Sequence, residues 1–218
     1  MRKNTNIVFG LLLVLLALYS CESTPTASTD NTTETPTEAP VTTGNQTDAP
    51  LASGLDYTLE AKRAGDFSIG GALTERAEEK GYSLEKRSQM AEGNEEPYYI
   101  VSGEGESLLR IEPRYNLETG TYDDVVGKIT VISDRYKMAN GIGVGSSIDE
   151  FQKAYADAKF WHSNVGQFFA METAEVPVQF LLQDADFIQT EKEMVGESTP
   201  LEATDFKAGC KVSGVRVF

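Results

Sequence analysis

The sequence has few of the residues that most often carry chemistry. Its 218 residues include one histidine, His162, and two cysteines, Cys21 and Cys210. Zinc sites usually draw several ligands from these two residue types, and so few histidines and cysteines exclude a zinc cluster. A serine nucleophile needs a base within hydrogen-bond reach, but Ser163 and His162 are strand neighbours and point to opposite faces. We therefore expect no catalytic residue, no metal site and no cofactor, and we expect His162 on the surface of a strand.

Basic residues are also scarce, with 19 lysines and arginines against 34 acids and a net charge of −15. Nucleic acid and anionic lipid surfaces both need a basic footprint, so neither is expected as the main partner. The densest acidic clusters are Asp123–Asp124 and Asp184–Asp186. A calcium loop starting at Asp184 would need glycine and glutamate where the chain has Gln189 and Val195. We interpret these acids as solvated charges, with a carboxylate-based hydrolase as a remote alternative.

No apolar run is long enough to cross a membrane, which takes about 20 residues in a helix. The longest run, residues 7–18, follows Arg2 and Lys3 and leads into Leu18-Tyr19-Ser20-Cys21, the order of a secretory signal. LYSC resembles the bacterial lipobox, whose cysteine is diacylated on sulfur. The resemblance implies a lipoprotein signal peptide over residues 1–20 and a membrane anchor at Cys21. Because Glu22 follows instead of aspartate, we expect the outer membrane of a bacterial cell envelope, facing the periplasm.

After Cys21 the chain has almost nothing with which to build a core. Residues 22–50 contain ten threonines and four prolines, and Val41 is their one sizeable aliphatic residue. Such a segment cannot bury enough apolar surface to offset its ordering entropy. We expect a lipidated, disordered Thr/Pro-rich tether over residues 21–50, followed by a single domain over residues 51–218.

That domain reads as two similar halves, residues 65–133 and 134–218. Each has a glycine-containing turn, then a short helix, then strand-like segments, as alignment of residues 69–75 with 144–150 indicates. The helices are expected near 72–80, with Gly81 as the C-terminal cap, and over 148–156. We predict an α+β fold in which two helices pack on antiparallel sheet, with an acidic, loop-like stretch over 190–207. Two repeated β-α-β-β-β-type halves are one arrangement compatible with this pattern. The expected strands are 83–88, 98–102, 108–111, 128–132, 159–163, 168–173, 178–183 and 211–218.

The stretch MANGIGVGSS, residues 138–147, has glycines at alternate positions and invites comparison with a phosphate-binding loop. A dinucleotide fingerprint needs a third glycine where the chain has Ser146, and a P-loop needs a lysine that is missing. Ser147 and Glu150 have the spacing of a capping box instead. We therefore interpret this stretch as a turn followed by a helix cap.

The segments GGALTER, KITVISDRYKMANGIGVGSSIDEFQKAY and KVSGVRVF resemble a family of uncharacterised bacterial envelope lipoproteins, the RpoE-regulated type. The resemblance covers most of residues 65–218, and its motifs are structural. It implies a lipoprotein on the periplasmic face of the outer membrane, and it brings no catalytic residues.

Aromatic side chains supply the best candidate for a binding surface. Phe160 and Trp161 lie on one expected strand and Phe168 and Phe169 on the next, so alternation places some of them on each face. An exposed apolar patch would mark a binding site, and we nominate Trp161, Phe168 and Phe169. Cys210 has two readings, a buried inert thiol or an intermolecular disulfide.

The function expected from these features is that of a membrane-anchored envelope lipoprotein that binds a protein or a cell-wall component without catalysis. An alternative is an inhibitor-type module acting on a periplasmic hydrolase, because helix-plus-antiparallel-sheet repeats of this kind resemble those of secreted β-lactamase inhibitors.

Overall fold

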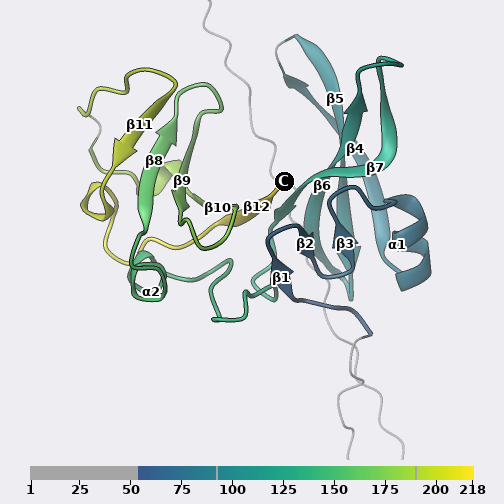
Figure 1. Ribbon diagram of the computed structural model, residues 1–218, viewed down its shortest axis with the longest axis horizontal. Helices are drawn as coiled ribbons and strands as arrows, with labels where there is room; N and C mark the ends of the chain where they lie inside the picture. The colour runs from purple at the N-terminus through teal and green to yellow at the C-terminus, as the bar shows by residue number, and fades with distance from the viewer. Residues whose placement is uncertain (1–53, 92, 190) are drawn as a thin grey trace, which may run out of the picture. The chain divides into compact units, whose positions relative to one another are not determined.

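The structure is a computed structural model that describes residues 54–91, 93–189 and 191–218 (Figure 1). By its internal contacts the chain separates into two units, Met1–Thr47 and Asp48–Phe218. The expected signal peptide over 1–20, the lipidation of Cys21 and the tether over 21–50 lie outside the described residues. In the described part of the chain, no helix has the length and hydropathy needed to span a membrane.

Within the described residues, twelve strands make two antiparallel sheets. The smaller sheet has the order β1-β2-β3, and the larger has the order β11-β8-β9-β10-β12-β7-β6-β5-β4. The strands are β1 (Leu59–Glu60), β2 (Arg63–Ala64), β3 (Phe67–Ser68), β4 (Ser83–Ala91), β5 (Asn94–Gly103), β6 (Glu106–Asn116), β7 (Thr121–Val131), β8 (Lys159–Ser163), β9 (Phe168–Glu172), β10 (Val178–Leu182), β11 (Ser198–Leu201) and β12 (Gly214–Val217).

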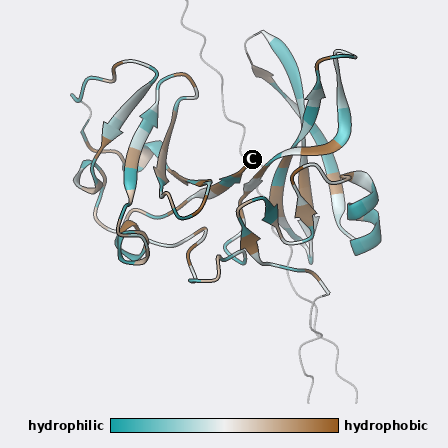
Figure 2. Cartoon of the chain, viewed as in Figure 1, coloured by the Kyte–Doolittle hydropathy of each residue, from teal (hydrophilic) through white to brown (hydrophobic). Residues whose placement is uncertain are grey.

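The α+β prediction is wrong, and the fold is β-rich. The described residues form only two α-helices, α1 (Thr74–Lys80) and α2 (Ile148–Ala154), each seven residues long. Short 3-10 turns occur at Asp184–Asp186 and Ala203–Asp205. Figure 2 shows α1 as almost entirely hydrophilic, and its one buried residue is Ala77. Helices this short bury too little surface to form a layer of their own, so strand-to-strand packing dominates.

The local signals around both helices are confirmed. Gly81 ends α1 in the left-handed conformation with φ of 75°. Ser147 Oγ accepts a hydrogen bond from the Glu150 amide at 3.2 Å, and the Glu150 carboxylate accepts one from the Ser147 amide at 2.7 Å. These two bonds are the predicted capping box, which satisfies amides that the first turn of a helix leaves without partners.

The glycines of MANGIGVGSS allow backbone conformations and a close backbone contact that other residues would not permit. Gly141 and Gly145 have φ values of 84° and 85°, a region that glycine enters without steric cost. A Cβ on Gly143 would lie 2.3 Å from the carbonyl oxygen of Tyr136, so the two backbone segments approach too closely for any side chain. The interpretation of this stretch as a turn and a cap is confirmed.

The C-terminal strand β12 joins the two groups of strands. It pairs with β10 on one side and with β7 on the other, and Figure 1 shows it between β8–β10 and β4–β7. Side chains from both groups share one buried cluster, which includes Val131 of β7, Phe180 of β10 and Val215 of β12. One continuous sheet therefore runs through both expected halves.

The stretch over 190–207, expected to be loop-like, contains an edge strand. Thr199 and Leu201 of β11 alternate inward and are buried, while β11 pairs with β8. Pro200 lies between them, and proline is tolerated in a strand at the edge of a sheet because it has no amide hydrogen to donate. The strand was not predicted because acidic residues flank this short segment, in which buried and exposed residues alternate.

Candidate functional site: an aromatic and arginine face of the sheet

The large sheet has one face against the buried cluster and one turned away from it, which we call the open face. The strand register defines it. Across the neighbouring strands β10, β12, β7 and β6, each strand contributes one residue to a row of cross-strand partners on the same face. These residues are Gln179, Arg216, Thr130 and Arg110. Their strand neighbours, such as Phe180, have the opposite parity and are buried.

Trp161 and Phe168 both lie on the open face. Trp161 pairs with Ala170 across β8 and β9, and Phe168 has the parity of Ala170. The two rings meet in an edge-on contact with centroids 5.4 Å apart. Both side chains are half-buried, and Ala170 beneath them is fully buried. The structure therefore brings together two of the three nominated aromatic residues.

Phe169 is not part of this surface. It is 7% exposed on the core side of β9, where its ring stacks on Phe187 at 4.7 Å and contacts Phe206 at 5.7 Å. The two-residue alternation of a strand separates it from Phe168, so both could not belong to one patch. The nomination of Phe169 as a binding residue is incompatible with this burial.

His162 also faces the core, contrary to the expected place on a strand surface. It is 8% exposed, its ring lies 4.5 Å from that of Phe169, and its Nδ1 is 2.7 Å from Asn164 Oδ1. The expectation failed because Phe187 and Phe206, from segments outside the predicted strands, cover this side of β8 and β9. The histidine is held as part of the packing.

Arg216 is the basic residue nearest the aromatic pair. Its guanidinium lies over the Phe168 ring, 4.3 Å from the centroid, and Nη1 donates to Gln179 Oε1 at 3.3 Å. Among the described residues, no carboxylate lies within ion-pair distance of it. Burial lowers the pKa of Arg216; the charge of Glu112 opposes that shift, while the charge of Arg110 adds to it.

Arg110 occupies the same row on the other side of Thr130, and it is better compensated. Its guanidinium lies 4.0 Å from the Tyr98 ring centroid, and Nη2 donates to Gln89 at 2.6 Å. Glu112 is 3.3 Å away and also pairs with Lys128. The positive charge of the open face is therefore least neutralised at Arg216.

Hydrogen-bond donors without acceptors gather on this face. In the described residues four buried side-chain atoms have no partner: Trp161 Nε1, Arg110 Nε, Arg216 Nε and the hydroxyl of Tyr136. The first three belong to the open face. Leaving a buried donor unmet costs about 1–3 kcal/mol, so these three groups lower the stability of the folded chain.

Sequence reasoning missed both arginines, although a signal existed. Each stands between two buried aliphatic residues, as Leu109-Arg110-Ile111 in β6 and Val215-Arg216-Val217 in β12. In a strand that inserts one charged residue into an apolar alternation, the charge must lie on the opposite face. That pattern places both arginines on one side of the sheet once the register is known.

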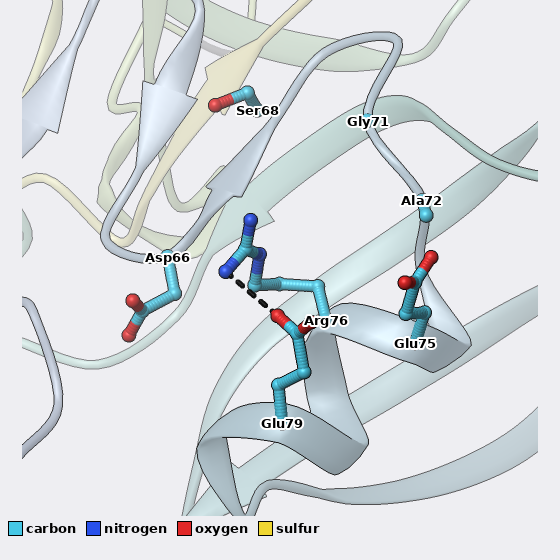
Figure 3. Close-up of a pocket in the computed structure, with 7 residues that line it drawn as sticks. All are labelled: Asp66, Ser68, Gly71, Ala72, Glu75, Arg76 and Glu79. Atoms are coloured by element: carbon cyan, nitrogen blue, oxygen red, sulfur yellow. Dashed lines mark hydrogen bonds and ion pairs between the residues drawn. The ribbon is translucent and has the colours of Figure 1, made fainter.

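A separate small pocket of about 160 Å³ lies between β3 and α1 (Figure 3). Its lining includes Asp66, Glu75 and Glu79, and Figure 3 shows the Arg76 guanidinium paired with Glu79, at 2.9 Å. Asp66 accepts a hydrogen bond from Tyr82 at 2.8 Å and pairs with Lys80 at 3.1 Å. Asp66 and Glu79 already have protein partners, so the pocket offers less to a ligand than the open face.

The two acidic clusters singled out in the sequence have structural partners. Asp124 accepts hydrogen bonds from the amide and hydroxyl of Thr74 at the start of α1, at 3.2 and 2.8 Å. Asp123 pairs with Arg114 at 3.1 Å, and Asp186 lies 3.9 Å from Lys207. In the residues that the structure covers, no group of three or more potential ligands is arranged to hold a metal ion.

Cys210 is buried, 4% exposed, as the first of its two readings requires, and its inertness stays a prediction. Burial raises the pKa of the thiol to about 11, and the negative charge of Asp186 adds to the rise.

We expect Cys210 to react with iodoacetamide at pH 8 roughly 100-fold more slowly in the native chain than in denaturant, because the thiolate is the reactive form. Mass spectrometry of the peptide containing Cys210 measures this rate. Equal rates with and without denaturant would contradict the burial.

No family model matches the sequence, and no curated protein matches it. Among solved structures, the chain is similar to the uncharacterized protein YfeY from Escherichia coli, at 13% identity with a TM-score of 0.47. The match covers 74% of this chain and 98% of that one.

Proposed function

We propose that this protein is a non-enzymatic binding module, held on the bacterial cell envelope by a lipid anchor at Cys21, that binds a protein or cell-wall component through its open face. The anchor is supported by the lipobox-like sequence. The binding role is supported by one observation above all. Trp161 and Phe168 form a pair on the face away from the core, beside an arginine, and tryptophan and arginine are the residues most enriched where binding energy concentrates.

The chemistry of this face favours binding over catalysis. The open face presents aromatic rings, arginines and two carboxylates that already have protein partners: Glu112 pairs with Arg110 and Lys128, and Glu172 accepts a hydrogen bond from Gln179 at 3.0 Å. Acid–base catalysis needs a group that can gain and lose a proton near neutral pH, and the Arg216 guanidinium that lies on the Phe168 ring is not suited to that task. A half-buried aromatic pair beside a cation is suited to holding a partner in place.

In-cell photo-crosslinking tests this proposal. A photoreactive amino acid replaces Lys159, an exposed residue of β8 two positions before Trp161 and on the same face. The control probe replaces Glu78, which is exposed on α1. We expect a discrete adduct of reproducible mass from position 159 and none of that mass from position 78. Identical adducts from both positions, or no adduct from the open face, would contradict the proposal.

A further inference from the structure

Arg216 is an anomaly in this chain. Acids outnumber basic residues by 34 to 19, yet in the described part of the protein this arginine is left without a carboxylate. Surface arginines elsewhere have such partners, as Arg63 has Asp56 at 2.8 Å. Removing a charged side chain from water costs free energy, and only well-placed ion pairs and hydrogen bonds offset that cost. Arg216 is nevertheless present, with its guanidinium over the ring of Phe168.

The surroundings define what would compensate it. Arg110 stands on the far side of Thr130 in the same row, so two strand spacings, about 10 Å, separate the two backbones. Glu112 and Gln89 already engage Arg110, which leaves Arg216 as the stronger anion anchor. On its other side Arg216 donates to Gln179, which in turn donates to the carboxylate of Glu172 at 3.0 Å, and the guanidinium lies on Phe168 of the Trp161–Phe168 pair.

We infer that Arg216 holds the carboxylate of an acidic peptide segment of a protein partner, with an apolar side chain of that segment packed on Trp161 and Phe168. The inference rests on the proposed function and names the chemistry of the partner.

A peptide meets each requirement of the site at once. Its carboxylate pairs with the guanidinium of Arg216, and its apolar side chain covers the aromatic pair. A neutral sugar would leave the charge of Arg216 uncompensated. An anionic lipid surface would meet the strongly acidic remainder of the chain, which repels it.

The site can be followed by fluorescence, because Trp161 is the one tryptophan in the chain. The full chain, purified in detergent, is titrated with the blocked peptide acetyl-Gly-Phe-Glu-Gly-amide. The matched control peptide carries glutamine in place of glutamate, and so removes the charge while keeping the shape. We expect a saturable change in fluorescence that is at least tenfold tighter for the glutamate peptide and weakens as salt is raised.

Variants assign the effect to Arg216. Arg216→Gln should abolish the difference between the two peptides, whereas Arg76→Gln, on α1, should preserve it. Equal binding of both peptides to the unaltered chain, or no response to either, overturns the inference without needing any variant to fold. Self-association of the chain that Arg216→Gln abolishes would also overturn it, by identifying a second copy as the occupant.

The outcome is separable from that of the proposed function. A crosslinked adduct from position 159 that survives Arg216→Gln leaves the binding role standing and overturns the role of the carboxylate. The absence of any open-face adduct contradicts the binding role itself.

Discussion

Replacing Phe180 with alanine is expected to lower the free energy of unfolding by about 3–5 kcal/mol. Phe180 lies in the middle of β10 and is 0% exposed. Its ring is 4.8 Å from that of Phe151 and 6.2 Å from that of Tyr155, which lies directly after α2. Truncation would leave a cavity between the helix and the sheet, and each atom lining it would lose packing contacts.

Urea denaturation of the full chain, followed by the fluorescence of Trp161, measures this loss. Phe218→Ala is the matched control, because Phe218 is the same residue type at 49% exposure and should change stability by no more than about 0.5 kcal/mol. A loss below about 1 kcal/mol for Phe180→Ala would show that α2 does not depend on this contact.

Gly143→Ala is expected to destabilise the protein by about 2–3 kcal/mol, in the upper range for overpacking. The added Cβ would lie 2.3 Å from the Tyr136 carbonyl oxygen, which is backbone and cannot move away as a side chain can. To relieve the clash, Gly143 would have to move away from Lys137, which would break the antiparallel bridge between these two residues that closes the turn. It would also disturb the hydrogen bond from the Met138 amide to Ile142, at 2.8 Å.

Gly141→Ala separates crowding from backbone conformation. Gly141 has φ of 84° and open space around it, so alanine there costs only the left-handed conformation, about 1 kcal/mol. Thermal unfolding of the two variants under one set of conditions makes the comparison. An effect of Gly143→Ala no larger than that of Gly141→Ala would contradict the close backbone approach.

Two groups of the open face reduce the stability of the folded chain. Arg216 and the indole of Trp161 hold donors that meet no acceptor in the described residues, and each such donor weakens the folded state. Buried polar groups without partners are expected where a sequence is not optimised for folding stability alone. The face therefore differs from the small acidic pocket beside α1, where Asp66, Arg76 and Glu79 already pair within the protein.

Much of the local structure could be predicted because it depends on neighbours in the sequence. The capping box needs only Ser147 and Glu150 three positions apart, and Gly81 ends a helix because glycine enters the left-handed region freely. The expected strand over 159–163 coincides with β8, since alternation of apolar residues is itself a local property.

The errors have one physical origin. A helix forms a layer of the fold only if other elements cover much of its surface, and sequence spacing does not show this coverage. In the structure α1 buries only one residue. His162 looked like a surface residue because nothing local predicts that Phe187 and Phe206 cross over its strand. The edge strand β11 was missed for the same reason, since it exists only through its pairing with β8.

By itself the sequence determined the two short helices with their caps, the strand β8 and which aromatic residues share a strand, because these follow from spacings of two to four residues. Only the tertiary structure decided that Trp161 and Phe168 stay on the open face while Phe169 and His162 are packed inside. It also placed Arg216 and Arg110 in one row across β12, β7 and β6. The reason is that strand order and register are set by long-range pairing, and short-range spacing carries no record of which strands become neighbours.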